Sequence, residues 1–480
     1  MKNLTLEAIT KACMGTYVGE DTFLQKEIQG AVTDSRQVEE GYLFIPIRGE
    51  RVDGHDFIPS VFEKGALAVL SEKPLEQAKG PYIQVESCPQ ALKDIAAYYR
   101  SQLAIPIVGI TGSVGKTSTK EMIASVLSTK YRVLKTAGNF NNEIGLPLTI
   151  LRIREEHEAA VVEMGISEFG EMHRLAAIAK PDVCVITNIG TCHLENLGDR
   201  DGVLKAKTEV FDHIKKGATV LLNGDDDKLI TVTEAGGNTP LFYGLERTAD
   251  GAGQSLLSIS MDKIENLGLK GTRAMLHTPA GDTQVEIPIP GSHNLYNAMA
   301  AAGAGLALGL TLSEIQQGIA AARTIGGRSN LIEAGGHLII DDCYNANPMS
   351  MRASLDVLKH GLKRTIAVLG DMGELGQQEK QLHYEVGAYA AKAGIDMLFC
   401  VGTLSAEMAK GARDALRKKA AVGSETAKEQ SKTKDTQVFY YATKEEMLPN
   451  LLGMVQEGDT ILVKASHFMD FSKVVEALTV

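Results

Sequence analysis

The sequence contains no tryptophan and only six cysteines among its 480 residues. No two cysteines form a Cys-x-x-Cys pair, so the chain has neither the usual zinc-binding spacing nor a redox dithiol. We expect reduced thiols, as in a cytoplasmic protein. No apolar run approaches the roughly 18 residues that cross a bilayer, and the first residues lack the apolar segment of a signal peptide. We therefore expect a cytoplasmic protein without membrane insertion.

An excess of basic residues is also missing. The formal net charge is −11, which argues against a nucleic-acid-binding protein, because such proteins normally present a basic face. Small anionic substrates remain compatible with this charge, since a few local groups are enough to hold them. The apolar fraction of 44% and the charged fraction of 23% are typical of a globular enzyme. The length predicts about three domains.

From about residue 105 the chain alternates short apolar runs with helical stretches. The candidate strands are residues 105–110, 159–164, 183–187 and 218–222. Continuous apolar runs of this kind are typical of a parallel sheet that is covered on both faces. Helical segments between them complete βαβ units. This part of the chain is predicted to be a P-loop ATPase-like domain with a parallel sheet.

A second series of the same kind follows, with candidate strands at 337–341, 365–369, 397–401 and 460–463. It predicts a C-terminal Rossmann-like α/β domain. The first hundred residues combine strand-like pieces such as 42–47 with a helix near 90–103, which predicts a smaller α/β domain. The fold class is thus α/β with three domains, and we place them at residues 1–104, 105–324 and 325–480.

A candidate phosphate-binding loop, Thr111-Gly-Ser-Val-Gly-Lys-Thr117, follows one apolar run and opens a helix at 116–127. Glycines let backbone N–H groups approach phosphate oxygens, and the helix N-terminus adds positive potential. Lys116 would neutralise the β- and γ-phosphates, and Thr117 would offer its hydroxyl to Mg²⁺. The strict G-x-x-x-x-G-K-[ST] pattern needs glycine at 110, where the chain has Ile110. The alternative is a chance Gly-Lys-Thr in a glycine-rich chain. The predicted ATP contacts are Thr111, Gly112, Ser113, Val114, Gly115, Lys116 and Thr117.

Two candidate metal ligands follow strands of the same sheet. Glu163 ends the run at 159–164, and His193 lies shortly after the run at 183–187. Ligands gather at the carboxyl ends of parallel strands, where the phosphate loop also lies. Carboxylate oxygen and imidazole there could hold Mg²⁺. Each residue alone is more often a surface or hydrogen-bonding residue. Lys207, on a predicted helix, has the local sequence of a solvated lysine.

Polar residues in two further segments allow more than one role. Asn294 and Asn297 are three apart on a predicted helix and share a face. Their amides suit the edge of adenine, but Ser292 or Asn294 could equally cap the helix. Acids and amides at 341–347 precede Pro348, where they suit ribose hydroxyls, a metal or a turn.

In chain order, these segments resemble the Mur ligases, ATP-dependent amide-forming enzymes of peptidoglycan assembly. The loop is similar to the family's T-G-[ST]-x-G-K-T form, which accounts for the missing glycine at 110. Further segments that fall in family order are 163–165, 188–193, 205–207, 293–297 and 327–328. The resemblance covers essentially the whole chain.

Within this family, the chain is most similar to the enzymes that add D-alanyl-D-alanine. The segments that carry this similarity are 33–36, 44–49, 53–57, 139–147, 341–348 and 370–376. The resemblance implies a monomer that uses ATP and two Mg²⁺ ions, with UDP-N-acetylmuramoyl-tripeptide and D-alanyl-D-alanine as substrates. The third residue of the tripeptide, lysine or diaminopimelate, is not readable from the chain.

The resemblance also implies roles for individual residues. Lys116, Lys207, His193 and Glu163 would be catalytic. Lys207 would be carbamylated, which converts an ammonium into a carboxylate-like ligand, and would bind metal together with Thr117, Glu163 and His193. ATP would also contact Asn294, Asn297, Arg328 and Asp342. The other substrates would contact Ser35, Arg36, Asn142, Asn345 and Asn347. The chain departs from the family's Lys-Gly-Ser-Arg at Lys464-Ala-Ser-His467.

Two other functions fit parts of the chain. A folylpolyglutamate synthase belongs to the same superfamily but has no comparable N-terminal domain. A regulatory ATP-binding module would bind nucleotide without forming an amide. The first hundred residues favour the muropeptide ligase.

Overall fold

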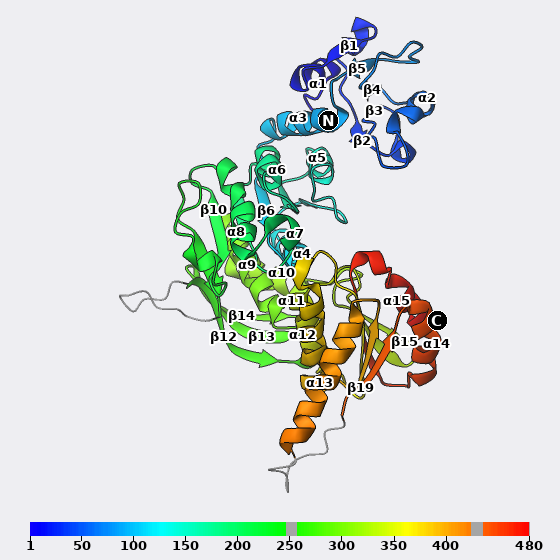
Figure 1. The fold of residues 1–480 in the computed structure, drawn as a ribbon. Helices are drawn as coiled ribbons and strands as arrows, with labels where there is room; N and C mark the ends of the chain where they lie inside the picture. The colour runs from blue at the N-terminus through cyan, green and yellow to red at the C-terminus, as the bar shows by residue number, and fades with distance from the viewer. Residues whose placement is uncertain (246–256, 424–434, 480) are drawn as a thin grey trace.

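The computed structural model describes residues 1–245, 257–423 and 435–479, and three β-sheets follow one another along this chain (Figure 1). We call them the N-terminal, central and C-terminal sheets, and each with its helices forms a unit. All three are covered by helices, which confirms the predicted α/β class. No helix in the described part of the chain is long and apolar enough to span a bilayer.

The N-terminal sheet has five short strands in the order β1-β5-β4-β3-β2, of which only β1 runs antiparallel to its neighbour. Helix α3 begins at a serine cap, Ser87, and its buried face packs against α5 and α6 of the central unit. This helix therefore joins the first unit to the second. The elements are α1 Leu6–Ala12, β1 Thr16–Val18, β2 Gly30–Val32, β3 Tyr42–Phe44, α2 Ile58–Glu63, β4 Ala68–Ser71, β5 Tyr82–Gln84 and α3 Cys88–Ser101.

The central sheet has nine strands in the order β14-β13-β12-β11-β10-β9-β6-β8-β7. From β7 to β12 all neighbours are parallel. Because its strands are buried on both faces, the sheet separates two apolar cores, one under α5, α6 and α8 and the other under α4, α9 and α10. The strands are β6 Ile107–Thr111, β7 Val133–Lys135, β8 Ala159–Glu163, β9 Val183–Ile186, β10 Thr219–Asn223, β11 Leu241–Gly244, β12 Leu257–Asn266, β13 Thr272–Thr278 and β14 Gly281–Ile287.

The helices of this unit place the candidate residues. Helix α4 spans the predicted 116–127, and α9 carries both asparagines of the predicted helix at 293–297. The helices are α4 Lys116–Leu127, α5 Gly145–Ile150, α6 Glu171–Ala179, α7 Leu194–Leu197, α8 Arg200–Thr208, α9 His293–Ala307 and α10 Leu312–Ala321. The antiparallel pairs β12–β13 and β13–β14 were not predicted; they extend the sheet away from the phosphate loop.

The C-terminal sheet has six strands in the order β15-β16-β20-β17-β18-β19. Only β15 is antiparallel to its neighbour, and the four predicted strands are all present. Apolar cores lie on both faces. The elements are β15 Asn330–Ala334, β16 His337–Asp341, α11 Pro348–Leu358, β17 Thr365–Gly370, α12 Glu379–Lys392, β18 Met397–Val401, α13 Ser405–Gly423, β19 Gln437–Tyr441, α14 Lys444–Met454, β20 Thr460–Lys464 and α15 Ser472–Thr479.

Candidate active site

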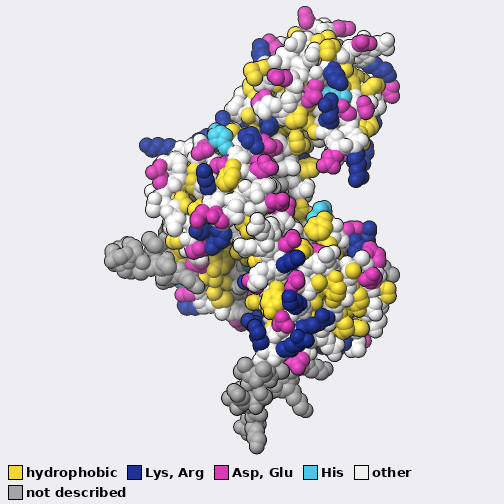
Figure 2. All heavy atoms as spheres, in the orientation of Figure 1, with side chains coloured by type: hydrophobic (Ala, Val, Ile, Leu, Met, Phe, Trp, Pro, Cys, Tyr) yellow, Lys and Arg dark blue, Asp and Glu magenta, His cyan; other side chains and the backbone are white. Residues whose placement is uncertain are grey.

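A cavity of about 900 Å³ lies between the central and C-terminal units. Its walls include the segment 113–118 from the start of α4, the polar residues after β8, β9 and β10, and the segment 342–354 from the C-terminal unit. Figure 2 shows the molecule hollowed between its N-terminal and C-terminal units on the side that faces the right of the view. The carboxyl ends of several parallel strands thus meet a second unit at one site, which is where α/β proteins bind ligands.

The loop between β6 and α4 depends on two glycines. Gly112 has φ +145° and Gly115 has φ +81°, both in the region that favours glycine. A Cβ at Gly112 would lie 1.9 Å from the Thr187 hydroxyl oxygen, so no larger residue fits there. Helix α4 begins directly after Gly115, at Lys116. The sequence therefore folds into a tight turn that leads to a helix N-terminus facing the cavity.

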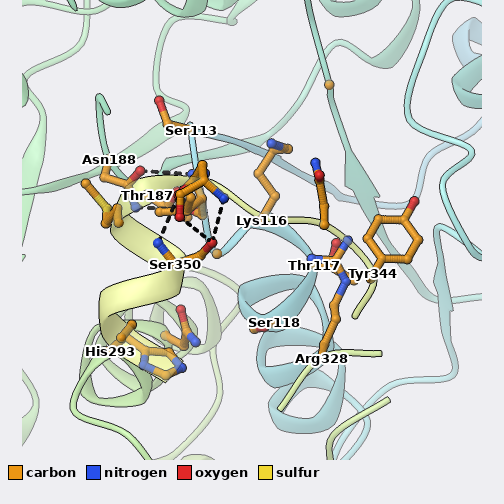
Figure 3. A pocket seen from close by; sticks show the side chains of 18 of the residues that line it. Ser113, Lys116, Thr117, Ser118, Thr187, Asn188, His293, Arg328, Tyr344 and Ser350 are labelled. Carbon is orange, nitrogen blue, oxygen red and sulfur yellow. Dashed lines mark hydrogen bonds between the residues drawn. The ribbon is translucent and has the colours of Figure 1, made fainter. Parts of the chain in front are cut away.

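Asn188 holds this loop from the neighbouring strand end (Figure 3). Its side-chain oxygen accepts the Val114 N–H at 3.0 Å, its amide donates to the Val114 carbonyl at 3.1 Å, and its own carbonyl accepts the Ser113 N–H at 3.0 Å. The Thr187 hydroxyl also donates to the Val114 carbonyl, at 2.6 Å. The first half of the loop is therefore fixed by the segment after β9.

We call the hydrogen bonds of Asn188 and Thr187 to Ser113 and Val114 the loop clamp. The loop clamp determines which N–H groups of the loop remain available to bind an anion. Because the N–H groups of Ser113 and Val114 are already used, neither is free for a phosphate. The N–H groups of Gly115, Lys116 and Thr117 donate to no acceptor in the described part of the chain. Three converging donors at a helix N-terminus suit a phosphate group. The Lys116 ammonium folds back onto the Gly112 carbonyl at 2.9 Å, a contact that a phosphate oxygen can replace.

The end of β8 supplies a buried carboxylate to the same place. Glu163 is 2% exposed, and its Oε2 accepts the Thr117 hydroxyl at 2.9 Å. Its other oxygen accepts the Asn141 amide at 2.9 Å. Lys120, also buried, lies 4.0 Å from Oε2 and donates to the Thr136 carbonyl at 2.7 Å. Thr117 and Glu163, both predicted as metal ligands, are thus hydrogen-bonded to each other, whereas Asn141 and Lys120 had no predicted role.

His193 follows β9 in a left-handed conformation, with φ +51°. Its Nδ1 lies 2.8 Å from Oε2 of Glu374, which belongs to the C-terminal unit. This hydrogen bond lowers the pKa of Glu374, because the imidazole favours the ionised carboxyl. His193 and Glu374 both line the cavity. The contact joins the two units directly beside the phosphate loop.

Lys207 is not the solvated lysine that its local sequence suggested. It lies on α8 with only 1% of its surface exposed, and its ammonium has no hydrogen bond or ion pair among the described residues. Burial, with a smaller effect from the Lys116 ammonium, lowers the pKa of Lys207 to about 8, while the charge of Cys192 acts in the opposite direction. About a tenth of this side chain is therefore a neutral amine at pH 7, far more than for an ordinary lysine.

Asn294 and Asn297 are both buried, and they are bonded to each other and to the protein. The Asn297 amide donates to the Asn294 side-chain oxygen at 2.8 Å, and the Thr119 hydroxyl donates to the Asn297 oxygen at 2.8 Å. The Asn294 amide donates to the Pro290 carbonyl at 2.9 Å. Neither residue caps the helix, and Ser292 makes no capping bond. In this conformation the pair fixes α9 against α4.

Arg328 and Asp342 come from the linker and the strand end of the C-terminal unit. The Arg328 guanidinium lies over the Tyr344 ring, 4.2 Å from its centroid, beside the cavity (Figure 3). Asp342 is buried and accepts the Lys464 ammonium at 2.6 Å, the Ser354 hydroxyl at 2.5 Å and the Ser329 N–H at 3.0 Å. Asp342 therefore braces this wall of the cavity.

The predicted substrate contacts fall into two groups. Asn142, Asn345 and Asn347 line the cavity. Asn142 accepts the Gly145 N–H at 2.8 Å, and Asn347 caps α11 by accepting the Ser350 N–H at 2.9 Å, so their side-chain oxygens also shape loops. Ser35 and Arg36 lie in the N-terminal unit and do not line the cavity; Arg36 is exposed and bonded to Asp34.

The cavity offers part of the ligand set that a divalent cation needs. The Thr117 hydroxyl and the Glu163 carboxylate, 2.9 Å apart, are the hard oxygen ligands that Mg²⁺ prefers. The described residues contain no group of three or more histidines, cysteines or acids arranged around one point. A magnesium ion here would therefore need water and phosphate oxygens to complete its octahedron, which is its usual state in phosphoryl-transfer sites.

Asn188→Ala tests the loop clamp. Losing two partly buried side-chain bonds costs about 1–3 kcal/mol, so we expect nucleotide affinity to fall by roughly ten- to a hundredfold while the protein stays folded. Isothermal titration with ADP measures this change. Asn188→Asp keeps the acceptor for Val114 N–H but turns an oxygen toward the Val114 carbonyl, so it should be no better. ADP affinity equal to that of the parent protein would contradict the clamp. Asn450→Ala, on an exposed face of α14, is the control.

Three models of Mur ligase domains match the chain. The model described as "Mur ligase family, catalytic domain" matches residues 27–100, the "Mur ligase middle domain" matches 110–305, and the "Mur ligase, glutamate ligase domain" matches 327–467. The UDP-N-acetylmuramoyl-tripeptide–D-alanyl-D-alanine ligase of Bacillus subtilis is 36% identical over 480 residues, covering 99% of this chain and 98% of its own.

Solved structures agree over the same length. A crystal structure of MurF from Acinetobacter baumannii has a TM-score of 0.86 and 34% identity, covering 99% of this chain and 98% of that one. The MurF ligase of Thermotoga maritima in complex with ADP has a TM-score of 0.78 and 30% identity, covering 94% and 97%. With matching domain models in the same order and similarity over nearly its full length, this chain belongs to the Mur ligase family.

Proposed function

We propose that this chain is an ATP-dependent ligase that joins D-alanyl-D-alanine to UDP-N-acetylmuramoyl-tripeptide. The products are the UDP-muramoyl-pentapeptide, ADP and phosphate. The observation that carries this proposal is the phosphate loop facing the Thr117–Glu163 pair, in a cavity large enough for a nucleotide and a peptide end. The relatives named above support the choice of substrates.

The reaction must first activate a carboxylate. A carboxylate oxygen of the tripeptide attacks the γ-phosphorus of ATP, the bond to the β-phosphate oxygen breaks, and ADP leaves. The resulting acyl phosphate has a good leaving group. The neutral amine of D-alanyl-D-alanine then attacks the acyl carbon, the tetrahedral species loses phosphate, and the amine proton goes to a base. Positioning and charge stabilisation supply most of the rate in such reactions.

The protein's own groups have separate tasks in this scheme. The N–H groups of Gly115, Lys116 and Thr117 hold phosphate oxygens, and the Lys116 ammonium leaves the Gly112 carbonyl to follow the charge on the transferred group. Arg328 and Asp342, together with Asn297 of α9, line the cavity and shape the nucleotide end. Asn142, Asn345 and Asn347 orient the peptide ends. We assign the base to no residue.

Thr117, Glu163, His193 and a carbamylated Lys207 would hold two Mg²⁺ ions, which supply positive charge to the phosphate oxygens when bound. The fit rests on the hydroxyl–carboxylate pair at 2.9 Å and on a buried lysine with no partner among the described residues. A neutral lysine amine reacts with CO₂, forming a C–N bond and releasing one proton. The anionic carbamate then gives this buried position a metal ligand.

The N-terminal unit would hold the uridine end of the long substrate. We propose that residues 1–104 bind UDP, that 105–324 bind ATP and Mg²⁺, and that 325–480 close over the nucleotide. Ser35 and Arg36 support this division, because they lie outside the cavity, in the unit built on the N-terminal sheet. A monomer in the cytoplasm fits a nucleotide-linked substrate of this kind.

One assay separates this function from its alternatives. Phosphate release is measured with ATP, UDP-muramoyl-tripeptide and D-alanyl-D-alanine, omitting each in turn. We expect release only with all three, with the pentapeptide identified by mass spectrometry. Release with a folate substrate instead would indicate a folylpolyglutamate synthase. Nucleotide binding without any acceptor-dependent turnover would indicate a regulatory module.

A further inference from the structure

The contact between His193 and Glu374 joins two residues that both have an uncommon backbone conformation. His193 has φ +51° and Glu374 has φ +61°, in a region that residues other than glycine seldom adopt. Their side chains meet at 2.8 Å between Nδ1 and Oε2. Two loops from different units are thus each shaped so that these side chains meet at the cavity.

The surroundings keep the two loops in register. Glu374 lies between β17 and α12 in the C-terminal unit, and Gly376 in the same loop faces α7 of the central unit. A Cβ at Gly376 would lie 3.8 Å from the backbone nitrogen of Glu195. Backbone contact and side-chain bond occur within three residues on each side. The His193–Glu374 bond therefore depends on the position of the C-terminal unit against the central unit. We call the arrangement in which this bond forms the seated arrangement.

The hydrogen bond between His193 Nδ1 and Glu374 also affects Nε2, the second nitrogen of the His193 ring. An ionised carboxylate can only accept, so Nδ1 carries a proton, and in the neutral ring Nε2 then has the free lone pair. A histidine that binds metal through one nitrogen usually donates its other N–H to a carboxylate or carbonyl, which fixes both tautomer and ring orientation. Glu374 stands in that relation to His193, which is a metal ligand in the proposed function.

We propose that Glu374 is a positioning residue that acts through His193, so that the metal site is complete only when the C-terminal unit is seated. The inference rests on the proposed function. It adds that the affinity of the site for the metal ion depends on the position of the C-terminal unit. By linkage, a metal ion at Nε2 favours the seated arrangement as much as that arrangement favours the ion. Glu374 touches neither Thr117 nor Glu163 among the described contacts.

The test is Mn²⁺ binding to the full-length protein with a non-hydrolysable ATP analogue, followed by electron paramagnetic resonance. We expect Glu374→Ala to weaken Mn²⁺ binding by about tenfold, within the range for lost partners of metal-binding histidines. Glu374→Gln keeps an acceptor for Nδ1–H and should lose less. Affinity for the analogue in EDTA should be unchanged in both variants, a separation that general destabilisation would not give. Glu374 is 64% exposed at its side chain, so folding is preserved.

A double-mutant cycle makes the test specific. In a His193→Ala background, Glu374→Ala should cause no further loss of Mn²⁺ affinity, because Glu374 acts only through the missing His193 side chain. Glu476→Ala, an exposed acid on α15, is the control. Parent-like Mn²⁺ affinity in Glu374→Ala, or losses that add in the double variant, would overturn the inference and leave the proposed function standing. Failure of the parent protein to bind Mn²⁺ with the analogue would overturn both.

Discussion

Lys116→Ala is expected to abolish acceptor-dependent phosphate release, with a loss of at least about a thousandfold in kcat, the scale of removing a transition-state cation in phosphoryl transfer. Lys116 is the only side-chain cation of the loop. Of the other cations that line the cavity, Arg200 is paired with Asp227 and Lys464 with Asp342, and Arg328 lies over the Tyr344 ring. They cannot replace Lys116 without losing those partners. A coupled assay of phosphate release measures the effect.

The control for this variant is Lys130→Ala, which removes an exposed ammonium just beyond α4 that donates to the Gly309 carbonyl. It should keep parent-like turnover. Binding of ADP to Lys116→Ala should persist at reduced affinity, because the three backbone N–H donors remain. Turnover within tenfold of the parent protein would exclude the role given to Lys116 and would place the phosphate elsewhere in the cavity.

The sequence predicted the well-buried parallel strands of the central and C-terminal sheets, because such strands read as continuous apolar runs. It missed the parallel strands β7, β11 and β19, which are only partly buried. The antiparallel strands β13 and β14 have a different pattern. Only alternate residues are buried there, such as Ala274 and Leu276 on β13 and Val285 and Ile287 on β14. A search for continuous apolar runs passes over such segments, although period-two alternation would have found them.

Local motifs in the sequence indicated the phosphate loop and Glu163. The prediction of the site was incomplete where residues of one loop form hydrogen bonds with another loop. Asn188 belongs to the segment 188–193 that resembles the family, but nothing in the neighbouring sequence indicates that it bonds to Val114, more than seventy residues away. Glu374 likewise stood in the segment 370–376 without a role. Contacts between units depend on how the units pack, which local patterns do not encode.

The burial of Lys207 shows the same limit. Its segment carries two lysines and reads as an exposed helix, yet Lys205 is exposed while Lys207 is buried two residues later. The two side chains point about 200° apart on a helix, so one faces solvent and the other the core. The two lysines differ only in which face of α8 packs against the core, and the local sequence does not indicate that face. The family resemblance alone indicated a role for Lys207 from the sequence.

Lys207→Ala is expected to lose activity almost completely, and short-chain carboxylates at millimolar concentration are expected to restore part of it. The variant removes the amine that would carry the carbamate and leaves a buried space on α8. A free carboxylate can enter such a space and offer the same oxygen ligands. Phosphate release with and without acetate or formate measures the rescue.

Dependence on CO₂ gives a second readout in the parent protein. Because the pKa of Lys207 is lowered to about 8, the neutral amine that reacts with CO₂ becomes scarcer as pH falls below that value. We compare activity at about pH 6.5 and about pH 8.5, which lie on either side of this pKa. Exhaustive removal of CO₂ should reduce activity more at the lower pH, and bicarbonate should restore the activity. Lys207→Ala should respond to carboxylates but not to bicarbonate.

Lys205→Ala is the matched control, since Lys205 lies on the same helix with its ammonium in solvent, 5.7 Å from the centre of the Phe169 ring. It should keep full activity and need no carboxylate. Lys207→Arg keeps a cation but forms no carbamate, so it should be as inactive as Lys207→Ala. If Lys207→Arg were active, charge rather than carbamylation would explain the buried lysine. If Lys207→Ala were inactive without any carboxylate rescue while remaining folded, the carbamate would lose its support, and Thr117, Glu163 and His193 would have to hold the metal with water.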